Sequence, residues 1–160
     1  MVGDFAVGKT SLTQQFVNHV FSEQYLTTIG VKIDTKIIDR GEGDQCKLVI
    51  WDVAGRDSLT PLQTNYLMGA SGFLLVVDGT RRESIDSMKF LIDQAMKQLP
   101  NTPFLILFNK HDLADEWLIT QEDVKLLETK KWSYLNVSAK TGKNVEIAFA
   151  KLVTKMLGEG

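Results

Sequence analysis

Gly3-Asp4-Phe5-Ala6-Val7-Gly8-Lys9-Thr10 stands near the beginning of a chain of 160 residues. Two glycines with four residues between them are followed by lysine and threonine, and then by helical spacing of apolar residues over 9–19. This pattern is typical of a loop that binds phosphate groups at the start of a helix. Glycines let backbone N–H groups point inward at phosphate oxygens, and the helix adds its positive amino end. We therefore expect Lys9 to reach the terminal phosphates and the Thr10 hydroxyl to bind Mg²⁺, with a chance glycine-rich turn as the alternative.

Strand-like patterns follow this loop. Residues 32–39 alternate apolar and polar side chains, and the turn at 41–44 predicts that residues 46–51 fold back as an antiparallel partner. The apolar runs at 73–77 and 104–108 are typical of strands buried on both faces of a parallel sheet. A last strand is predicted at 132–137.

Helix-like patterns lie between these strands. After the first helix they occur at 85–99, after Thr120, and at 145–156. Thr120 and Asp123 have the spacing of a capping box, and Pro100 ends the preceding helix. Because strands and helices alternate, residues 1–160 are predicted to form one three-layer α/β domain.

Composition excludes several classes of protein. The apolar share of 44% and the charged share of 24% are ordinary for a globular domain, which excludes disordered, collagen-like and coiled-coil chains. A net charge of −2 argues against a nucleic-acid partner. Cys46 is the single cysteine, so we expect a reducing, cytoplasmic compartment. The longest apolar runs are much shorter than the about 20 residues that cross a membrane.

Polar residues follow the predicted strands at the edge where such sheets bind ligands. They are Asp52, Asp78, Asn109 and Ser138. In Asn109-Lys110-His111-Asp112, the Asp112 carboxylate can accept the two N–H groups that guanine presents and adenine lacks. A backbone N–H in Ser138-Ala139-Lys140 can meet the guanine carbonyl, and Lys110 and Lys140 can lay their stems over the ring faces. The sequence thus favours guanine, although a polar turn is the alternative for the first motif alone.

Together these motifs carry a family resemblance. The loop at 3–10, Thr28 in Thr27-Thr28-Ile29-Gly30, Trp51-Asp52-Val53-Ala54-Gly55 and the segments 109–112 and 138–140 resemble the motifs of the Ras-like small GTPases, in the same order. Further segments at 29–31, 47–55 and 66–70 are similar to the Rab branch. The resemblance implies an α/β P-loop fold with a mostly parallel six-stranded sheet, one antiparallel edge strand and about five helices. It also implies a GTP/GDP-binding switch that uses Mg²⁺.

The resemblance assigns a role to each matching position. Nucleotide contacts are implied for Gly3, Asp4, Phe5, Ala6, Val7, Gly8, Lys9, Thr10, Ser11, Phe21, Tyr25, Thr28, Gly55, Asn109, Lys110, Asp112, Ser138, Ala139 and Lys140. The implied Mg²⁺ ligands are Thr10, Thr28 and, through a water, Asp52. The implied catalytic residues are Lys9, Thr28, Gly55 and Arg56. Phe21 is implied to stack on guanine, with a core aromatic as the alternative. Loss of the γ-phosphate is implied to release the segments around Thr28 and Gly55.

Four positions depart from the family pattern, one of them Thr27, where many relatives have proline. Arg56 stands where the family has its catalytic glutamine, and Phe5 replaces a usually small residue of the loop. A guanidinium only donates hydrogen bonds, so it cannot accept one from the attacking water. We therefore expect slow intrinsic hydrolysis of GTP, with Arg56 as a catalytic arginine as the counter-hypothesis. Ile33 replaces an aromatic of the Rab partner-binding triad, whose other positions hold Trp51 and Tyr66.

Two alternatives to a slow switch remain. A pseudo-GTPase would use bound GTP only to hold a binding surface, and it would share the same site. An ATP-using phosphotransferase would share only the loop. The guanine-type motifs and the lack of an evident arginine-bearing lid segment disfavour the phosphotransferase.

Protein partners are expected on one face. Effector proteins are expected at the strand between Lys32 and Asp39, at Trp51, and at the segment between Arg56 and Tyr66. The resemblance also implies an exchange factor and a GTPase-activating protein.

The two ends of the chain carry further expectations. Only Met1 and Val2 precede Gly3, so we expect the first strand of the sheet to be shortened. Gly158-Glu159-Gly160 lacks the prenylated cysteines of Rab and Ras proteins. Membrane attachment is therefore not expected from this chain, and peripheral association would need a lipidated tail beyond it.

Overall fold

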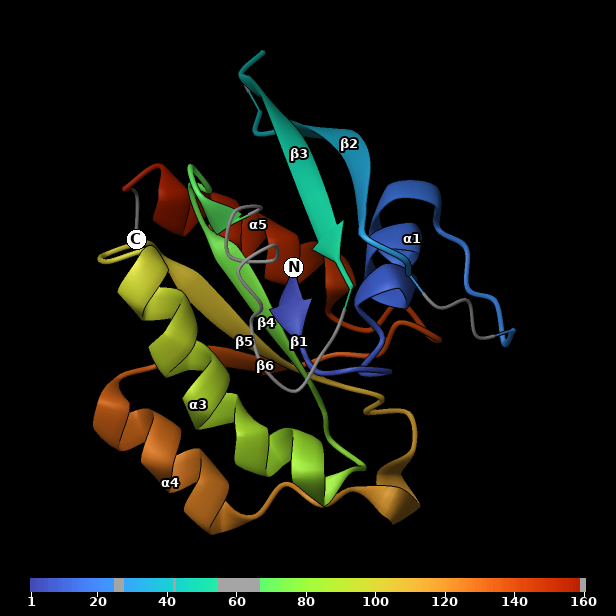
Figure 1. The fold of residues 1–160 in the computed structure, drawn as a ribbon. Coiled ribbons are helices and arrows are strands. Elements are labelled where there is room, and N and C mark those ends of the chain that lie inside the picture. The colour runs from blue at the N-terminus through green and yellow to red at the C-terminus, as the bar shows by residue number, and fades with distance from the viewer. Residues whose placement is uncertain (25–27, 42, 55–66, 159–160) are drawn as a thin grey trace.

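A parallel sheet forms the middle layer of the fold (Figure 1). The computed structural model describes residues 1–24, 28–41, 43–54 and 67–158. The sheet consists of β1 (Val2–Gly3), β4 (Phe73–Asp78), β5 (Phe104–Asn109) and β6 (Tyr134–Asn136), in the order β1-β4-β5-β6 with all neighbours parallel. Every residue of β4 and all but the first of β5 are buried, as the two apolar runs predict. Asp78 pairs with Asn109 in the sheet register, which brings the carboxyl ends of β4 and β5 to one edge.

Helices cover both faces of this sheet, which confirms the three layers. In the described residues they are α1 (Lys9–Asn18), α3 (Arg82–Gln98), α4 (Gln121–Lys130), α5 (Val145–Met156) and the 3₁₀ turn η1 (Ala114–Glu116). Figure 1 shows α1 and α5 on one side and α3 and α4 on the other. On the first side, Phe16 of α1 stacks on Phe149 of α5 with ring centroids 3.8 Å apart. On the second side, Ile92 of α3 and Leu127 of α4 belong to one buried cluster.

Local chemistry sets the start of α4. Thr120 caps it as the spacing predicts: the Thr120 hydroxyl accepts from the Asp123 N–H, and the Asp123 carboxylate accepts from the Thr120 N–H. Arg82, at the start of α3, donates two hydrogen bonds to the same carboxylate (2.8 and 2.9 Å). These bonds lower the pKa of Asp123 to about 2 and join α4 to α3. Within the described ranges, none of the helices has the length and apolar character needed to cross a bilayer.

An antiparallel hairpin stands beside the parallel sheet. β2 (Val31–Asp39) and β3 (Gln45–Val53) pair over their full length, with Ile33 opposite Trp51. The predicted turn is confirmed: Gly41 and Gly43 adopt left-handed φ values, and the Asp44 N–H donates to the Gly41 carbonyl oxygen.

The division of the strands into sheets corrects one expectation. The resemblance implies a single six-stranded sheet, whereas the strands of the described residues form a four-stranded parallel sheet and a two-stranded antiparallel one. The first strand is short, as predicted, and its two residues pair with β4. A hydrogen bond from the Met1 amino nitrogen to the Trp51 carbonyl oxygen (2.7 Å) reaches β3. A single contact of this kind does not extend into a ladder, because a ladder needs successive residues on both strands.

Candidate functional site

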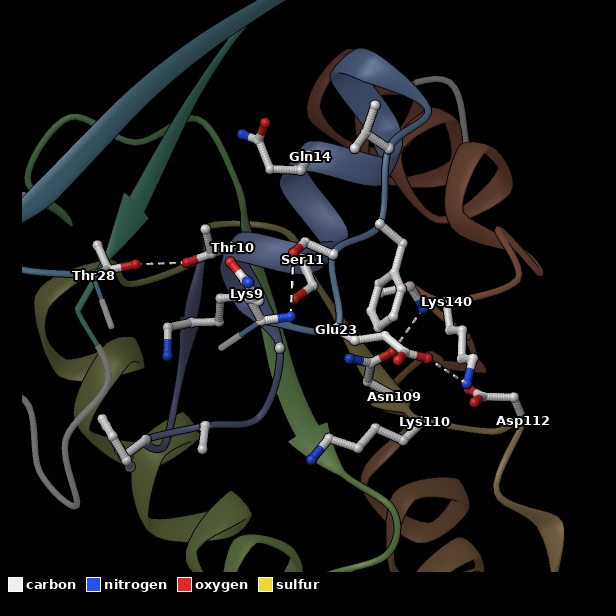
Figure 2. Close-up of a pocket in the computed structure, with 18 of the residues that line it drawn as sticks. Lys9, Thr10, Ser11, Gln14, Glu23, Thr28, Asn109, Lys110, Asp112 and Lys140 are labelled. Atoms are coloured by element: carbon white, nitrogen blue, oxygen red, sulfur yellow. Dashed lines mark hydrogen bonds and ion pairs between the residues drawn. The ribbon is translucent and has the colours of Figure 1, made fainter. Parts of the chain in front are cut away.

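A cavity of about 770 Å³ opens at the carboxyl edge of the parallel sheet. It gathers residues that the sequence assigns to separate motifs: Phe5, Ala6, Gly8, Lys9, Thr10, Ser11, Phe21, Thr28, Asn109, Lys110, Asp112, Ala139 and Lys140. Figure 2 shows Thr10 and Thr28 toward one end of this group, and Asp112 and Lys140 toward the other. The fold therefore brings segments that are far apart in the sequence around one space.

The remaining candidates fall into two groups. The first group is buried, and each member is hydrogen-bonded to a residue that lines the cavity: Gly3, Asp4, Val7, Asp52 and Ser138. Tyr25, Gly55 and Arg56 lie outside the described residues, so their roles stay predictions.

The cavity also contains residues that were not predicted to belong to the site. They are Gln14, Val20, Ser22, Glu23, Gln24, Ile29, Lys32 and Leu113. Their signal in the sequence is only that each lies close to a predicted residue. For those between 20 and 32, reaching the cavity depends on the path of the chain after α1, and no local pattern encodes that path.

Steric limits explain the two glycines of the phosphate-binding loop. A Cβ on Gly8, which has a φ of 95°, would collide with the side-chain amide of Asn109. A Cβ on Gly3 would collide with the carbonyl oxygen of Val76 in β4. Ala6 adopts a φ of 61°, a left-handed conformation that costs an L-residue ~1–2 kcal/mol. The loop is thus packed closely against β4 and Asn109, and it contains one strained residue.

Lys9 begins α1 and reaches back across the loop. Its Nζ donates to the carbonyl oxygens of Gly3 (3.0 Å) and Asp4 (2.8 Å). Burial lowers the pKa of Lys9 to about 8, although the nearby carboxylates of Asp52 and Asp4 oppose this shift. A buried charge is costly without a partner, so an anion that binds in the cavity beside the Lys9 ammonium group would stabilise its charged form.

Three oxygen-bearing side chains meet near Lys9. Thr10 Oγ1 donates to Asp52 Oδ2 (2.5 Å) and lies 2.6 Å from Thr28 Oγ1. Asp52 is fully buried, and its Oδ1 has no hydrogen-bond partner among the described residues. Hydroxyls with one carboxylate suit Mg²⁺, which takes oxygen ligands and keeps waters and phosphate oxygens as the others. These residues therefore fit the metal that the resemblance implies.

Asn109 and Asp112 are oriented by other predicted residues. Asn109 Nδ2 donates to the Val7 carbonyl oxygen (2.9 Å), and its Oδ1 accepts from the Ala139 N–H (3.1 Å). Asp112 Oδ1 accepts from Ser138 Oγ (2.6 Å). Asn109 thus ties the loop, β5 and the segment after β6 together, while Ser138 fixes the direction of the Asp112 carboxylate.

The lysines expected over a ligand ring have carboxylate partners. Lys110 Nζ pairs with Asp78 Oδ2 at the end of β4 (2.6 Å), and Lys140 Nζ pairs with Glu23 Oε1 (3.3 Å). Both lysines line the cavity, so each stem is held there by an anchored ammonium group. Phe21 lines the cavity and also packs against the core, so both alternatives for this residue describe part of its environment.

A parallel sheet whose first strand leads through a glycine-rich loop into a helix, with a buried lysine across the loop, defines a P-loop nucleotide-binding protein. The sequence matches the Ras family over residues 1–158, and the chain belongs to that family. It is similar to the Ras-related protein Rab-4A of Homo sapiens, with 35% identity over 99% of this chain and 73% of that protein. It is also similar to Rab-4B of Rattus norvegicus, with 34% identity over 99% of this chain and 75% of that protein.

These matches confirm the resemblance to small GTPases and to the Rab branch. Membership in the family implies binding of guanine nucleotide and Mg²⁺, and GTPase activity, in general terms. It likewise implies interaction with effectors, exchange factors and GTPase-activating proteins in general.

Proposed function

We propose that this chain is a cytoplasmic GTP/GDP-binding molecular switch that hydrolyses GTP slowly and acts in signalling or trafficking through nucleotide-dependent binding of effectors. Residues 1–160 would form its single G domain. The observation that carries the proposal is the cavity that combines the phosphate-binding loop, Thr28 and the segments after β5 and β6.

The phosphate end of the cavity supports the first half of this proposal. Residues 3–8 would present backbone N–H groups to the phosphates, Lys9 would add a positive charge, and Ser11 lies in the first turn of α1. Thr10 and Thr28 would bind Mg²⁺ directly and Asp52 would bind it through a water. Mg²⁺ would neutralise the charge on the transferred phosphate.

The residues at the other end of the cavity support the choice of guanine as the base. Asp112 would accept both guanine N–H groups, and the Ser138 hydroxyl on its Oδ1 holds the carboxylate in one orientation. Phe21, Lys110 and Lys140 would cover the faces of the ring.

Calorimetric titration of nucleotide-free protein tests the choice of nucleotide. We expect GDP to bind more tightly than ATP, and chromatography of the ligand released by heat to identify a guanine nucleotide. Tighter binding of ATP would contradict the proposal and favour the phosphotransferase alternative.

Slow turnover is the second half of the proposal. Phe5 lines the cavity with 47% of its surface exposed, where it would crowd the γ-phosphate and hinder an inserted arginine of a partner. Arg56, at the position of the family glutamine, lies outside the described residues. We expect intrinsic hydrolysis at or below the ~10⁻⁴ s⁻¹ scale of unassisted Ras-type proteins.

Single-turnover kinetics with two variants test this rate. Arg56→Gln should accelerate GTP cleavage, and Phe5→Gly should add to the gain. If Arg56→Gln slows cleavage, then Arg56 is catalytic and the slow-switch proposal is wrong. If cleavage stays undetectable in the double variant, the pseudo-GTPase, which the exposed Phe5 at the phosphate end favours, replaces the slow switch.

The hairpin supplies a surface for effectors. Ile33 (51% exposed) lies opposite Trp51 (40% exposed), and Val49 and Ile37 lie further along the same face. Exposed apolar side chains on an edge hairpin are suited to a protein partner. Hydrogen exchange at residues 28–39 should differ between the GDP state and a state with a GTP analogue. Equal exchange in the two states would contradict nucleotide-dependent binding.

A further inference from the structure

Arg81 connects the start of α3 to the phosphate-binding loop. Its Nη2 donates to the Phe5 carbonyl oxygen (2.6 Å) and to Asp4 Oδ2 (3.2 Å), across a sequence separation of 76 residues from Phe5. Its Nε is buried and has no acceptor in the part of the chain that the structure describes. The loop therefore provides the acceptors that hold this guanidinium, and none of the sequence motifs assigns a role to Arg81.

Asp4 completes this contact. Its side chain is largely buried, and its Oδ1 accepts from the Phe5 N–H (2.6 Å) while its Oδ2 faces Arg81. Both backbone polar groups of Phe5 are thus fixed: the N–H by Asp4, and the carbonyl by Arg81. Hydrogen bonds of this kind, with an ionised donor or acceptor, are stronger than those between neutral groups.

Fixing the Phe5 carbonyl also fixes the next N–H. The described backbone contains no cis peptide bond, so the Phe5 C=O and the Ala6 N–H point in opposite directions within one planar unit. With the carbonyl turned to Arg81, the Ala6 N–H points away from Arg81, and both Phe5 and Ala6 line the cavity. Ala6 adopts this orientation at a φ of 61°, a conformation that persists when surrounding contacts enforce it.

We propose that Arg81 is a positioning residue of the nucleotide site: by binding the Phe5 carbonyl, it holds the Ala6 N–H toward the bound phosphates. Arg81 acts through the loop, from the side opposite the phosphates. The inference rests on the proposed function, because it takes the acceptor of this N–H to be a phosphate oxygen of a guanine nucleotide.

Arg82 provides a matched control. It carries the same charge one residue further on, but its guanidinium pairs with Asp86 (2.7 Å) and Asp123 (2.8 Å) and not with the loop. The Arg81 side chain does not cap α3, and its backbone carbonyl, which accepts the first hydrogen bonds of the helix, is kept in Arg81→Ala. Arg81→Ala therefore removes the loop contact and preserves the start of α3.

The test measures the release of a fluorescent GDP analogue after mixing with excess GDP. Arg81→Ala should accelerate release about tenfold, the change that one lost charge-assisted hydrogen bond commonly produces, and Arg82→Ala should leave it unchanged. The same pair is then compared in an Ala6→Gly background. Glycine enters the left-handed region without the steric penalty, so the effect of Arg81→Ala should be roughly fivefold smaller there.

Two results would overturn the inference. One is release from Arg81→Ala at the rate of Arg82→Ala, and the other is an equal effect of Arg81→Ala in the wild-type and in the Ala6→Gly background. Thermal unfolding checks that each variant is folded, and Arg81→Lys, which keeps the charge but not the planar fork, replaces Arg81→Ala if the latter unfolds. A wild-type chain that fails to retain GDP contradicts the proposed function itself, and release rates in the variants are compared only once wild-type retention is established.

Discussion

The parallel sheet and the β2–β3 hairpin differ in how their strands are buried. Every residue of β4 is buried, whereas no residue of β2 is, and the exposed side chains of the hairpin include several large apolar ones. Strands covered by helices on both faces are held by burial, because apolar area removed from water is the main favourable contribution to folding. The hairpin is covered on one face only: Ile50 belongs to the core cluster, Ile38 and Leu48 pack against that cluster, and the opposite face is exposed.

The cavity lies where these two regions meet. The loop, Asn109 and Asp112 belong to the sheet side, whereas Asp52 lies in β3 and Thr28 lies just before β2. The Thr10–Asp52 and Thr10–Thr28 contacts therefore join the two regions at the proposed metal site. We infer that a terminal phosphate with Mg²⁺, bound at this junction, would change the contacts that join the hairpin to the loop. The buried sheet would keep its conformation.

The largest difference between the regions is expected in stability. Leu75 in β4 is fully buried, and Leu75→Ala should lower the free energy of unfolding by about 2–5 kcal/mol through lost burial and the cavity left behind. Ile37 in β2 is 61% exposed, and Ile37→Ala should change the free energy of unfolding by less than about 0.5 kcal/mol. Urea unfolding of both variants measures the two values. A similar loss in both would show that the exposed face of the hairpin contributes to stability as much as the buried sheet does.

The same contrast explains which features could be predicted from sequence. The runs 73–77 and 104–108 identify buried parallel strands because burial on both faces removes the polar alternation. The loop, Asn109 and Asp112 are recognisable because phosphate and base recognition impose residue types at fixed short spacings. These constraints are local, and the structure places the corresponding residues in one cavity.

Contacts between distant segments could not be predicted in this way. The partner of Lys110 is Asp78 and that of Lys140 is Glu23, and no short motif contains either pair. The contact of Arg81 with the loop spans 76 residues. The split of the strands into two sheets depends on how many residues of β1 find a partner in β3, which is a property of the assembled sheet.

Nucleotide binding should depend on the sheet side of the cavity. Lys9→Ala removes the buried ammonium group beside the loop and should weaken GDP binding by about one to two decades in the presence of Mg²⁺. Lys151→Ala, at an exposed position of α5, is the control and should bind like the wild type. Calorimetric titration compares the dissociation constants. Wild-type affinity of Lys9→Ala would refute the assignment of the loop.

Base selectivity is expected to change by a smaller amount. Asp112→Asn exchanges a double acceptor for a donor and an acceptor, so preference should move from guanine toward xanthine nucleotides by about one decade. Asp115→Asn, in the exposed turn η1, should keep the wild-type preference. Competition between GDP and XDP for a fluorescent nucleotide gives both selectivities. An unaltered preference in Asp112→Asn would mean that Asp112 does not face the base.

The smallest effect is expected at the Arg82–Asp123 ion pair, which joins α3 to α4 on the sheet side but is not held by burial. Asp123→Ala removes the capping box and this pair, so it should lower the free energy of unfolding by about 1 kcal/mol near neutral pH. Glu122→Ala, on the same turn, is the control and should have little effect.

The pH dependence of that effect identifies its source. The pKa of Asp123 lies at about 2 in the folded protein, below its ordinary value of 3.8, mainly because Arg82 donates to its carboxylate. A depressed carboxyl pKa contributes stability that is present above pH 4 and is lost as the pH falls through about 2. The difference between wild type and Asp123→Ala in urea unfolding should therefore shrink between pH 4 and pH 2. A difference that stays constant over this range would assign the effect to the shape of the Asp123 side chain rather than to its charge. Burial and local packing, and not this ion pair, would then account for the stability of the sheet side.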